Sequence, residues 1–192
     1  RPDGVGFGVA LAHVYPSTLY GDVLEEVERV AIAAVRAIGL QNGIAYPQLL
    51  VTGNEVRVVE IAARIPAGQM DEVPRLGVGI DLIDIALRQA LGEPVPDDLV
   101  TPFWQQPLAI RFLTAEPGPL PTGSVRSVGP LDKARAFPGV ERVDTWIQPG
   151  ETIRPVQTDG DRRGYVIARG DTNFEALERA DAAAGLIDVL TQ

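Results

Sequence analysis

Residues 43–68 read GIAYPQLLVTGNEVRVVEIAARIPAG, and this stretch decides the fold predicted for the first half of the chain. Two β-rich runs flank Gly53-Asn54, a dipeptide typical of hairpin turns. The second run carries Glu60 and Arg64, and a proline-glycine loop follows it directly. We therefore expect an antiparallel hairpin with charged side chains near its end.

The length of the turn decides which residues of this hairpin face each other. A two-residue loop pairs Gln48 with Val59 and places Gln48 and Glu60 on opposite faces. A loop of three residues (Gly53 to Glu55) or of five places Gln48 directly opposite Glu60. Because side chains alternate along a strand, Glu60 and Arg64 are expected on one face.

The odd-loop register gives this face a chemical character. It offers one carboxylate and one amide oxygen to a hard cation such as Mg²⁺. The guanidinium of Arg64 could grip an oxyanion in bidentate fashion. The other interpretation of the same spacing is an ordinary exposed face with a cross-strand ion pair, worth less than about 1 kcal/mol.

Helical patterns stand on both sides of the hairpin. Before it, apolar residues recur at helical spacing from Val23 to Ile38, and Gly39 ends the segment. After it, a helix is expected from Asp81 to Leu91. An opening strand is expected at about Val5 to Val14.

A proline-rich linker, GEPVPDDLVTPFWQQP at residues 92–107, separates the first unit from a second unit with a different pattern of expected elements. Its expected elements are strands at 108–115, 124–127, 140–147 and 162–170, a short helix near 131–137 and a last helix from about Thr172 to Leu190. We therefore predict an α+β protein with two domains, residues 1–98 and residues 99–192.

Composition excludes several classes of protein. The 192 residues carry a net charge of −9 and no basic cluster, which argues against nucleic acid or an anionic membrane as partner. No apolar run is long enough to span a bilayer, and the start has no signal-peptide pattern. The chain has no cysteine, which excludes thiolate metal sites. We expect a cytoplasmic protein.

The start of the chain predicts that more protein precedes it. The first residues are Arg-Pro-Asp-Gly, and Met70 is the only methionine. We expect the C-terminal piece of a longer, truncated protein. Lys133 is the only lysine, so any lysine that binds phosphate is expected in another part of the protein.

A family resemblance adds to this reading. The runs RAIGLQNGIAYPQLLVTGNEVRVVEIAARIPAGQM (36–70) and GVGIDLIDIALRQALG (77–92) resemble the C-terminal half of the ATP-grasp domain. They are most similar to the branch that contains L-amino-acid ligases and carnosine synthase. The tail RRGYVIARGDTNFEALERADAAAGLI (162–187) is similar to the C-terminal domain of that branch. The order of elements carries the resemblance, since no single short motif does.

The resemblance implies roles at matching positions. Glu60 matches the second metal-binding acid, and Arg64 matches the catalytic arginine that meets the phosphoryl group or acyl-phosphate. Gln48 falls at the first metal ligand, a position that glutamine also occupies in carbamoyl phosphate synthetase. Gly68 falls in the glycine loop that approaches the carboxylate substrate. Glu60, Gln48 and Gly68 are thus implied to bind the cofactors, ATP and Mg²⁺ (or Mn²⁺), with Glu60 and Gln48 on the metal.

The chain departs from the family pattern at two of these positions. The family asparagine, also a metal ligand, falls on Ala62, which has no ligand atom. Gln48 is neutral, so Glu60 is the one formal carboxylate left. We favour a lean but working site in which ATP itself does most of the coordination.

The resemblance implies part of an ATP-dependent carboxylate-amine ligase, which forms an acyl-phosphate and then an amide or peptide bond from small-molecule substrates. The piece alone is expected to be inactive. One alternative is a degenerate ATP-grasp module that binds or regulates, and another is a biotin-carboxylase-like enzyme that activates bicarbonate. A homodimer could form through either the C-terminal domain or the preceding segment. His13, the only histidine, is interpreted as a packed strand residue or as a contact to substrate or phosphate.

Overall fold

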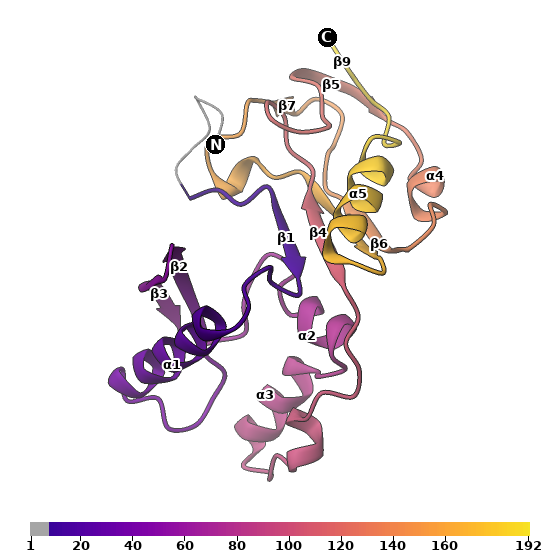
Figure 1. The fold of residues 1–192 in the computed structure, drawn as a ribbon. Coiled ribbons are helices and arrows are strands. Elements are labelled where there is room, and N and C mark those ends of the chain that lie inside the picture. Colours follow the sequence, from indigo (N-terminus) through magenta and orange to yellow (C-terminus); the bar gives the residue numbers. More distant parts are fainter. Residues whose placement is uncertain (1–7) are drawn as a thin grey trace. The chain divides into compact units, whose positions relative to one another are not determined.

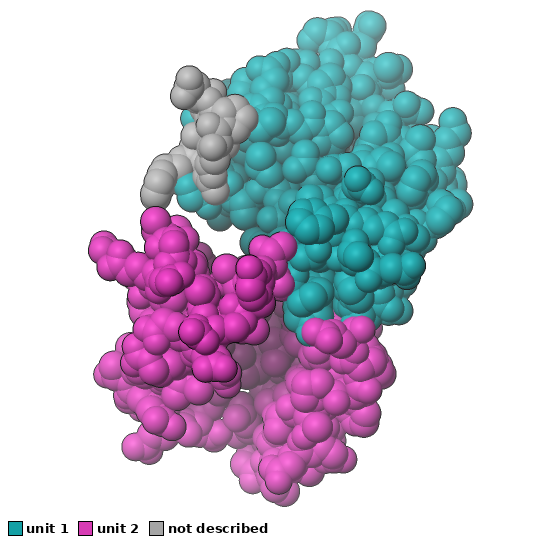
Figure 2. Space-filling view, viewed as in Figure 1, with its two compact units in different colours: residues 1–16, 106–192 teal, residues 17–105 magenta. Residues whose placement is uncertain are grey.

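The computed structural model describes residues 8–192, which form two compact units (Figure 2). Of the described residues, 8–16 and 106–192 form one unit, and 17–105 form the other. The predicted division at residue 98 lies close to the second crossing between the units. The first crossing was not expected: strand β1 (Ala12–Tyr15) belongs with the C-terminal unit because it pairs with β4 (Leu108–Phe112).

The unit of residues 17–105 contains the predicted hairpin and helices (Figure 1). Helix α1 packs against the hairpin. Asp81 caps the N-terminus of helix α3 (Leu82–Leu91), because its side chain accepts hydrogen bonds from the backbone N–H groups of Ile83 and Asp84, and the left-handed Gly92 caps the C-terminus. Both predicted helices are confirmed. The elements of this unit are α1 (Asp22–Ala37), β2 (Tyr46–Thr52), β3 (Glu55–Ala62), α2 (Glu72–Gly77), α3 (Leu82–Leu91) and the 3₁₀ turn η1 (Asp97–Val100).

The other unit is built around a four-stranded antiparallel sheet with strand order β1-β4-β8-β6. A three-stranded antiparallel sheet of order β7-β5-β9 accompanies it. The further elements are β5 (Gly123–Val128), α4 (Asp132–Arg135), β6 (Val140–Thr145), β7 (Thr152–Ile153), the 3₁₀ turn η2 (Asp159–Asp161), β8 (Gly164–Arg169), α5 (Asn173–Ala184) and β9 (Val189–Thr191). The α+β class with antiparallel sheets is confirmed.

Helix α5 covers the four-stranded sheet because its alanines allow a close approach. Ala176, Ala180 and Ala183 are fully buried, and α5 packs against β8 and β4. The core cluster joins α5 to both sheets. This core holds the C-terminal unit together, since apolar area removed from water contributes about 25 cal/mol per Å².

Two predicted elements differ from the structure. The last helix ends at Ala184 rather than near Leu190, because residues 189–191 pair with β5 as strand β9. Of the predicted opening strand, residues 5–7 lie outside the described residues, and the described strand covers Ala12–Tyr15. Among residues 8–192, no helix combines the length and apolar character that a membrane crossing requires.

Gly164, at the start of β8, is a point where the packing demands glycine. A Cβ there would lie 2.4 Å from the carbonyl oxygen of Asp144 and 2.7 Å from Cδ1 of Leu113. Gly164→Ala is therefore expected to lower the free energy of unfolding by about 1–3 kcal/mol. Urea unfolding followed by circular dichroism measures this loss.

Gly150→Ala is the matched control. Gly150 also has a positive φ (93°), but nothing lies within 4 Å of the position of its added Cβ. Only backbone strain of about 1 kcal/mol is expected there. Equal losses in the two variants would show that the close approach at Gly164 does not matter.

Candidate functional site

The hairpin places Gln48 opposite Glu60 although its turn is not one of the odd-length loops expected to do so. Its turn has two residues, since Thr52 pairs with Glu55. A β-bulge then interrupts the register between Gln48 and Leu49: Leu49 pairs with Val58, whereas Gln48 pairs with Glu60. The extra residue in β3 shifts the remaining pairs by one position. The bulge thus produces the pairing of Gln48 with Glu60 that was expected from a loop of three or five residues.

Gln48 and Glu60 face each other on the exposed side of the hairpin. Burial alternates along β2, so that Leu49 and Val51 are half-buried while Gln48 is exposed. Directly opposite residues of an antiparallel pair share a face, so Glu60 projects with Gln48. The Gln48 Nε2 donates a hydrogen bond of 3.5 Å to Oε1 of Glu60. The amide oxygen of Gln48 and the second oxygen of Glu60 remain available to a cation.

Tyr46 is a member of this group that the sequence analysis missed. It pairs with Ala62, two positions before Gln48 and on the same face. Partial burial raises the pKa of Tyr46, the negative charge of Glu60 raises it further, and the positive charge of Arg64 opposes the rise. Both charges act on one phenol, so Glu60 and Arg64 lie near Tyr46. The position two residues before Gln48 was the signal that could have identified it.

Arg64 lies beyond the strand. Strand β3 ends at Ala62, so the alternation argument does not reach Arg64. Its Nη1 donates a hydrogen bond of 3.0 Å to the carbonyl oxygen of Ile65, and its side chain is exposed. A single backbone hydrogen bond leaves most of the guanidinium donors available to an oxyanion.

The glycine loop is tightly turned. Gly68 has a φ of 69° and Gln69 a φ of 64°, so two successive residues are left-handed. Non-glycine residues rarely adopt this region. The loop is closed by the N–H of Glu72, which donates to the carbonyl oxygen of Gln69. Glu72 is buried and forms an ion pair with Arg75 within the first turn of α2.

Glu60 and Gln48 could contribute to holding a cation whose other ligands come mainly from a bound nucleotide and water. Within residues 8–192, no three side chains of the histidine, cysteine, aspartate and glutamate types are grouped to hold a metal ion. Glu60 and Gln48 offer a carboxylate and an amide oxygen side by side. Mg²⁺ is commonly held by one or two carboxylates plus water and substrate phosphates. The pair fits a Mg²⁺ ion that arrives with a nucleotide and does not form a closed protein cage.

His13 lies in the C-terminal unit and is packed. Its ring meets that of Phe112 edge-on, with centroids 5.5 Å apart. The guanidinium of Arg162 lies 4.0 Å from the centre of the Phe112 ring and forms an ion pair with Asp159. Burial lowers the pKa of His13 below its ordinary value of 6.5, Arg162 lowers it further, and Asp159 opposes this. The surroundings support the packed-residue interpretation.

This environment predicts a pH dependence of stability. Because the folded pKa of His13 is lowered, the unfolded chain binds the proton more readily than the folded chain. The contribution is complete above pH 6.5 and is lost as the pH falls through the folded pKa. As the pH falls from about 7 to about 5, the free energy of unfolding of His13→Phe is therefore expected to rise relative to that of the unchanged chain. Urea unfolding over this range measures the difference, and a constant difference would contradict it.

Comparisons with known proteins agree with this fold. Residues 111–192 match the family model of the L-amino acid ligase C-terminal domain 2. A formate-dependent phosphoribosylglycinamide formyltransferase of Sulfurisphaera tokodaii is 28% identical over 187 residues, which cover 97% of this chain and 42% of the relative. The chain therefore spans less than half the length of this curated relative.

Solved structures extend the likeness to nearly the whole chain. The L-amino acid ligase from Bacillus licheniformis has a TM-score of 0.81 at 17% identity, covering 97% of this chain and 45% of that structure. Phosphoribosylglycinamide synthetase from Anaerococcus prevotii has a TM-score of 0.78 at 16% identity, covering 95% and 45%. Residues 111–192 are therefore similar to the L-amino acid ligase C-terminal domain 2, and the chain shares its fold with about 45% of each of these ATP-grasp structures.

Proposed function

We propose that this chain is the metal- and phosphate-facing part of an ATP-dependent carboxylate-amine ligase. The observation that carries the proposal is the pairing of Gln48 with Glu60 by the bulge in β3. A fully regular two-residue hairpin would have separated these two side chains onto opposite faces. The match to an L-amino acid ligase domain at residues 111–192 supports the same conclusion.

The proposed reaction has two steps. A carboxylate oxygen of the first substrate attacks the terminal phosphorus of ATP, the bond from that phosphorus to the bridging oxygen breaks, and ADP leaves. The nitrogen lone pair of an amine then attacks the carbonyl carbon of the acyl-phosphate. The carbon–oxygen bond breaks, phosphate leaves with its electron pair, and the nitrogen loses a proton to give the amide.

The residues of the hairpin act on the charge of the transferred group. Glu60 and Gln48 would hold Mg²⁺, which when bound offsets the negative charge of the phosphate oxygens. Arg64 would bind the same oxygens with its exposed donors and stabilise charge that develops on them. The neutral phenol of Tyr46, whose pKa burial and Glu60 raise above its ordinary value, would donate a hydrogen bond beside Glu60. Gly68 would let the loop backbone approach the carboxylate substrate.

A non-catalytic ATP-grasp module is the second candidate. Ala62 stands where the family pattern has an asparagine ligand, and Tyr46 lies opposite it. With Glu60 as the one carboxylate paired with Gln48, the site could bind a nucleotide without turning it over. ATP binding and ATP turnover distinguish the two functions.

The test uses the full-length protein that contains this chain. ADP release is measured with panels of carboxylates and amines, including formate, bicarbonate, L-amino acids and phosphoribosylglycinamide. Release that depends on both a carboxylate and an amine supports the ligase. ATP binding without turnover across the panels supports the module, and release with bicarbonate alone supports a carboxylase. The 192-residue chain alone is expected to release no ADP, and the protein is expected in the cytoplasm.

A further inference from the structure

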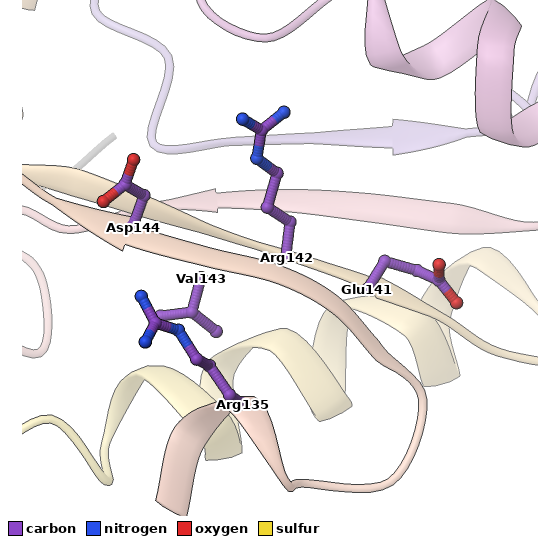
Figure 3. A pocket seen from close by; sticks show the side chains of 5 residues that line it. All are labelled: Arg135, Glu141, Arg142, Val143 and Asp144. Carbon is purple, nitrogen blue, oxygen red and sulfur yellow. The ribbon is translucent and has the colours of Figure 1, made fainter. Parts of the chain in front are cut away.

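A cavity of about 380 Å³ opens beside strand β6 in the C-terminal unit (Figure 3). Most of its charged side chains already have partners within the chain. Glu141 forms an ion pair with Arg169. The carboxylate of Asp144 accepts a hydrogen bond from the N–H of Thr145, and Arg142 is engaged as well. We therefore assign no ligand to this cavity, which is lined by Arg135, Glu141, Arg142, Val143 and Asp144.

The loop between α1 and β2 contains a chemically reactive pair, Asn42 followed by Gly43. Both residues are exposed. A backbone nitrogen can attack the side-chain amide of the asparagine that precedes it, and asparagine is a thermolabile residue for this reason. Glycine hinders the attack least, because it has no side chain and the greatest backbone freedom. The pair is therefore the first place in this chain where loss of a side-chain amide is expected.

The backbone of this loop is free to take part. In the part of the chain that the structure describes, the N–H of Gly43 donates no hydrogen bond. The preceding helix closes with the bond from the N–H of Gly39 to the carbonyl oxygen of Arg36, and strand β2 does not begin until Tyr46. A nitrogen that must lose its proton and turn toward a side chain needs this freedom.

The other two asparagines of the chain are placed differently. Asn54 lies in the hairpin turn, and the residue after it, Glu55, already belongs to strand β3. Asn173 is buried at the start of α5, where its Nδ2 donates a hydrogen bond of 2.7 Å to the carbonyl oxygen of Pro16. Each is followed by a residue with a large side chain. They therefore serve as internal references for Asn42.

One contact engages the side chain of Asn42. Its Oδ1 accepts a hydrogen bond of 2.9 Å from Nε2 of Gln89, in the last turn of α3. This bond leaves the carbon that is attacked and the nitrogen that departs without a partner. Because negative charge collects on Oδ1 during the attack, a donor at this oxygen stabilises the reacting state. The same bond joins the loop to α3.

We propose that Asn42 is a site of spontaneous deamidation. The backbone nitrogen of Gly43 loses its proton and attacks Cγ of Asn42, so that a new carbon–nitrogen bond closes a cyclic imide. The bond from Cγ to Nδ2 breaks, and the nitrogen leaves with the electron pair and a proton as ammonia. Water then opens the imide at either carbonyl, which gives aspartate or isoaspartate. Water is the one co-reactant, and the chain gains one negative charge.

Deamidation releases the loop from α3. Isoaspartate carries an extra methylene in the main chain and a shorter side chain, so it cannot keep the hydrogen bond with Gln89. Its negative charge also lies by the last turn of α3, where the helix dipole disfavours an anion. Local opening of the loop and of this turn follows. The proposal does not depend on the ligase reaction, since it needs only this loop and α3.

Incubation of the 192-residue chain at neutral and mildly alkaline pH tests the site. Peptide mass spectrometry follows each asparagine, since deamidation adds about 1 Da. In the folded chain, Asn42 should convert at least about tenfold faster than Asn54 or Asn173. Its rate should increase with pH and should approach the rate that Asn42 has in the urea-unfolded chain. Equal rates at the three asparagines, or a folded chain in which Asn42 is protected relative to urea, would overturn the proposal.

Hydrogen exchange before and after incubation tests the release of the loop. In the unchanged chain, the amides of residues 40–45 and of the last turn of α3 should lose protection in step with the conversion of Asn42. Asn42→Gln should keep its mass and its protection, because a longer side chain would have to close a larger ring. Asn54→Gln is the matched control and should age as the unchanged chain does. Conversion of Asn42 without any loss of protection would show that the hydrogen bond with Gln89 does not hold the loop.

Discussion

Glu60→Ala in the full-length protein is expected to lower carboxylate-dependent ADP release by about 10²–10³-fold, the loss typical when one group that offsets transition-state charge is removed. Glu60 is the carboxylate that stands opposite Gln48, and Gln48 alone supplies no formal charge. Glu60→Gln should lose nearly as much, because it keeps the shape of the side chain but not its charge. Steady-state assays at saturating ATP and Mg²⁺ measure this effect.

Glu55→Ala is the matched control for this prediction. Glu55 belongs to the same strand, is exposed like Glu60, and is engaged in an ion pair with Arg57 near the turn. An exposed pair of this kind contributes little to stability. Glu55→Ala should leave ADP release unchanged, and an equal loss in both variants would attribute the effect to the hairpin as a whole rather than to Glu60.

Arg64→Ala is expected to lower the same activity by about 10²-fold or more, because the guanidinium offsets charge on the transferred phosphoryl group. The loss should fall on kcat more than on KM, since that charge is largest in the transition state. Arg64→Lys should recover only part of the activity, because an ammonium group cannot grip two oxygens side by side.

Arg57→Ala controls for the removal of an arginine from the hairpin. Arg57 is exposed and its partner, Glu55, lies near the turn. Its removal should change neither kcat nor KM by more than about twofold, in line with the small effects of exposed ion pairs. If Arg64→Ala behaved in the same way as Arg57→Ala, Arg64 would be an ordinary surface residue.

The sequence left open whether Gln48 faces Glu60, since a two-residue turn was expected to separate them and an odd loop to pair them. Gly53-Asn54 is a strong two-residue turn signal, and the structure follows it. A bulge depends on how both strands pack and twist, and no residue type marks it in this hairpin. Val58 and Val59 are identical neighbours in the sequence and both are exposed, so sequence alone gives no basis for choosing the one that is left unpaired.

Other differences arise where distant segments meet. The predicted last helix ran too far because apolar residues at helical spacing continue past Gly185 to Ile187, whereas the pairing of Val189 with Val128 places the following residues in a strand. Strand β1 was assigned to the first domain by its position, whereas its partner strand begins at Leu108. Tyr46 was overlooked because an isolated tyrosine in a strand is most often a packing residue. Local patterns do not contain such long-range pairings.

Metal binding tests the central claim most directly. Titration of the full-length protein with Mn²⁺ in the presence of ATP, followed by electron paramagnetic resonance, reports the ion at the hairpin. The account predicts a tightly bound Mn²⁺ that requires ATP, is retained in Glu55→Ala and is lost in Glu60→Ala. Equal Mn²⁺ binding by Glu60→Ala and the unchanged protein would contradict the assignment of this hairpin as the metal- and phosphate-facing site.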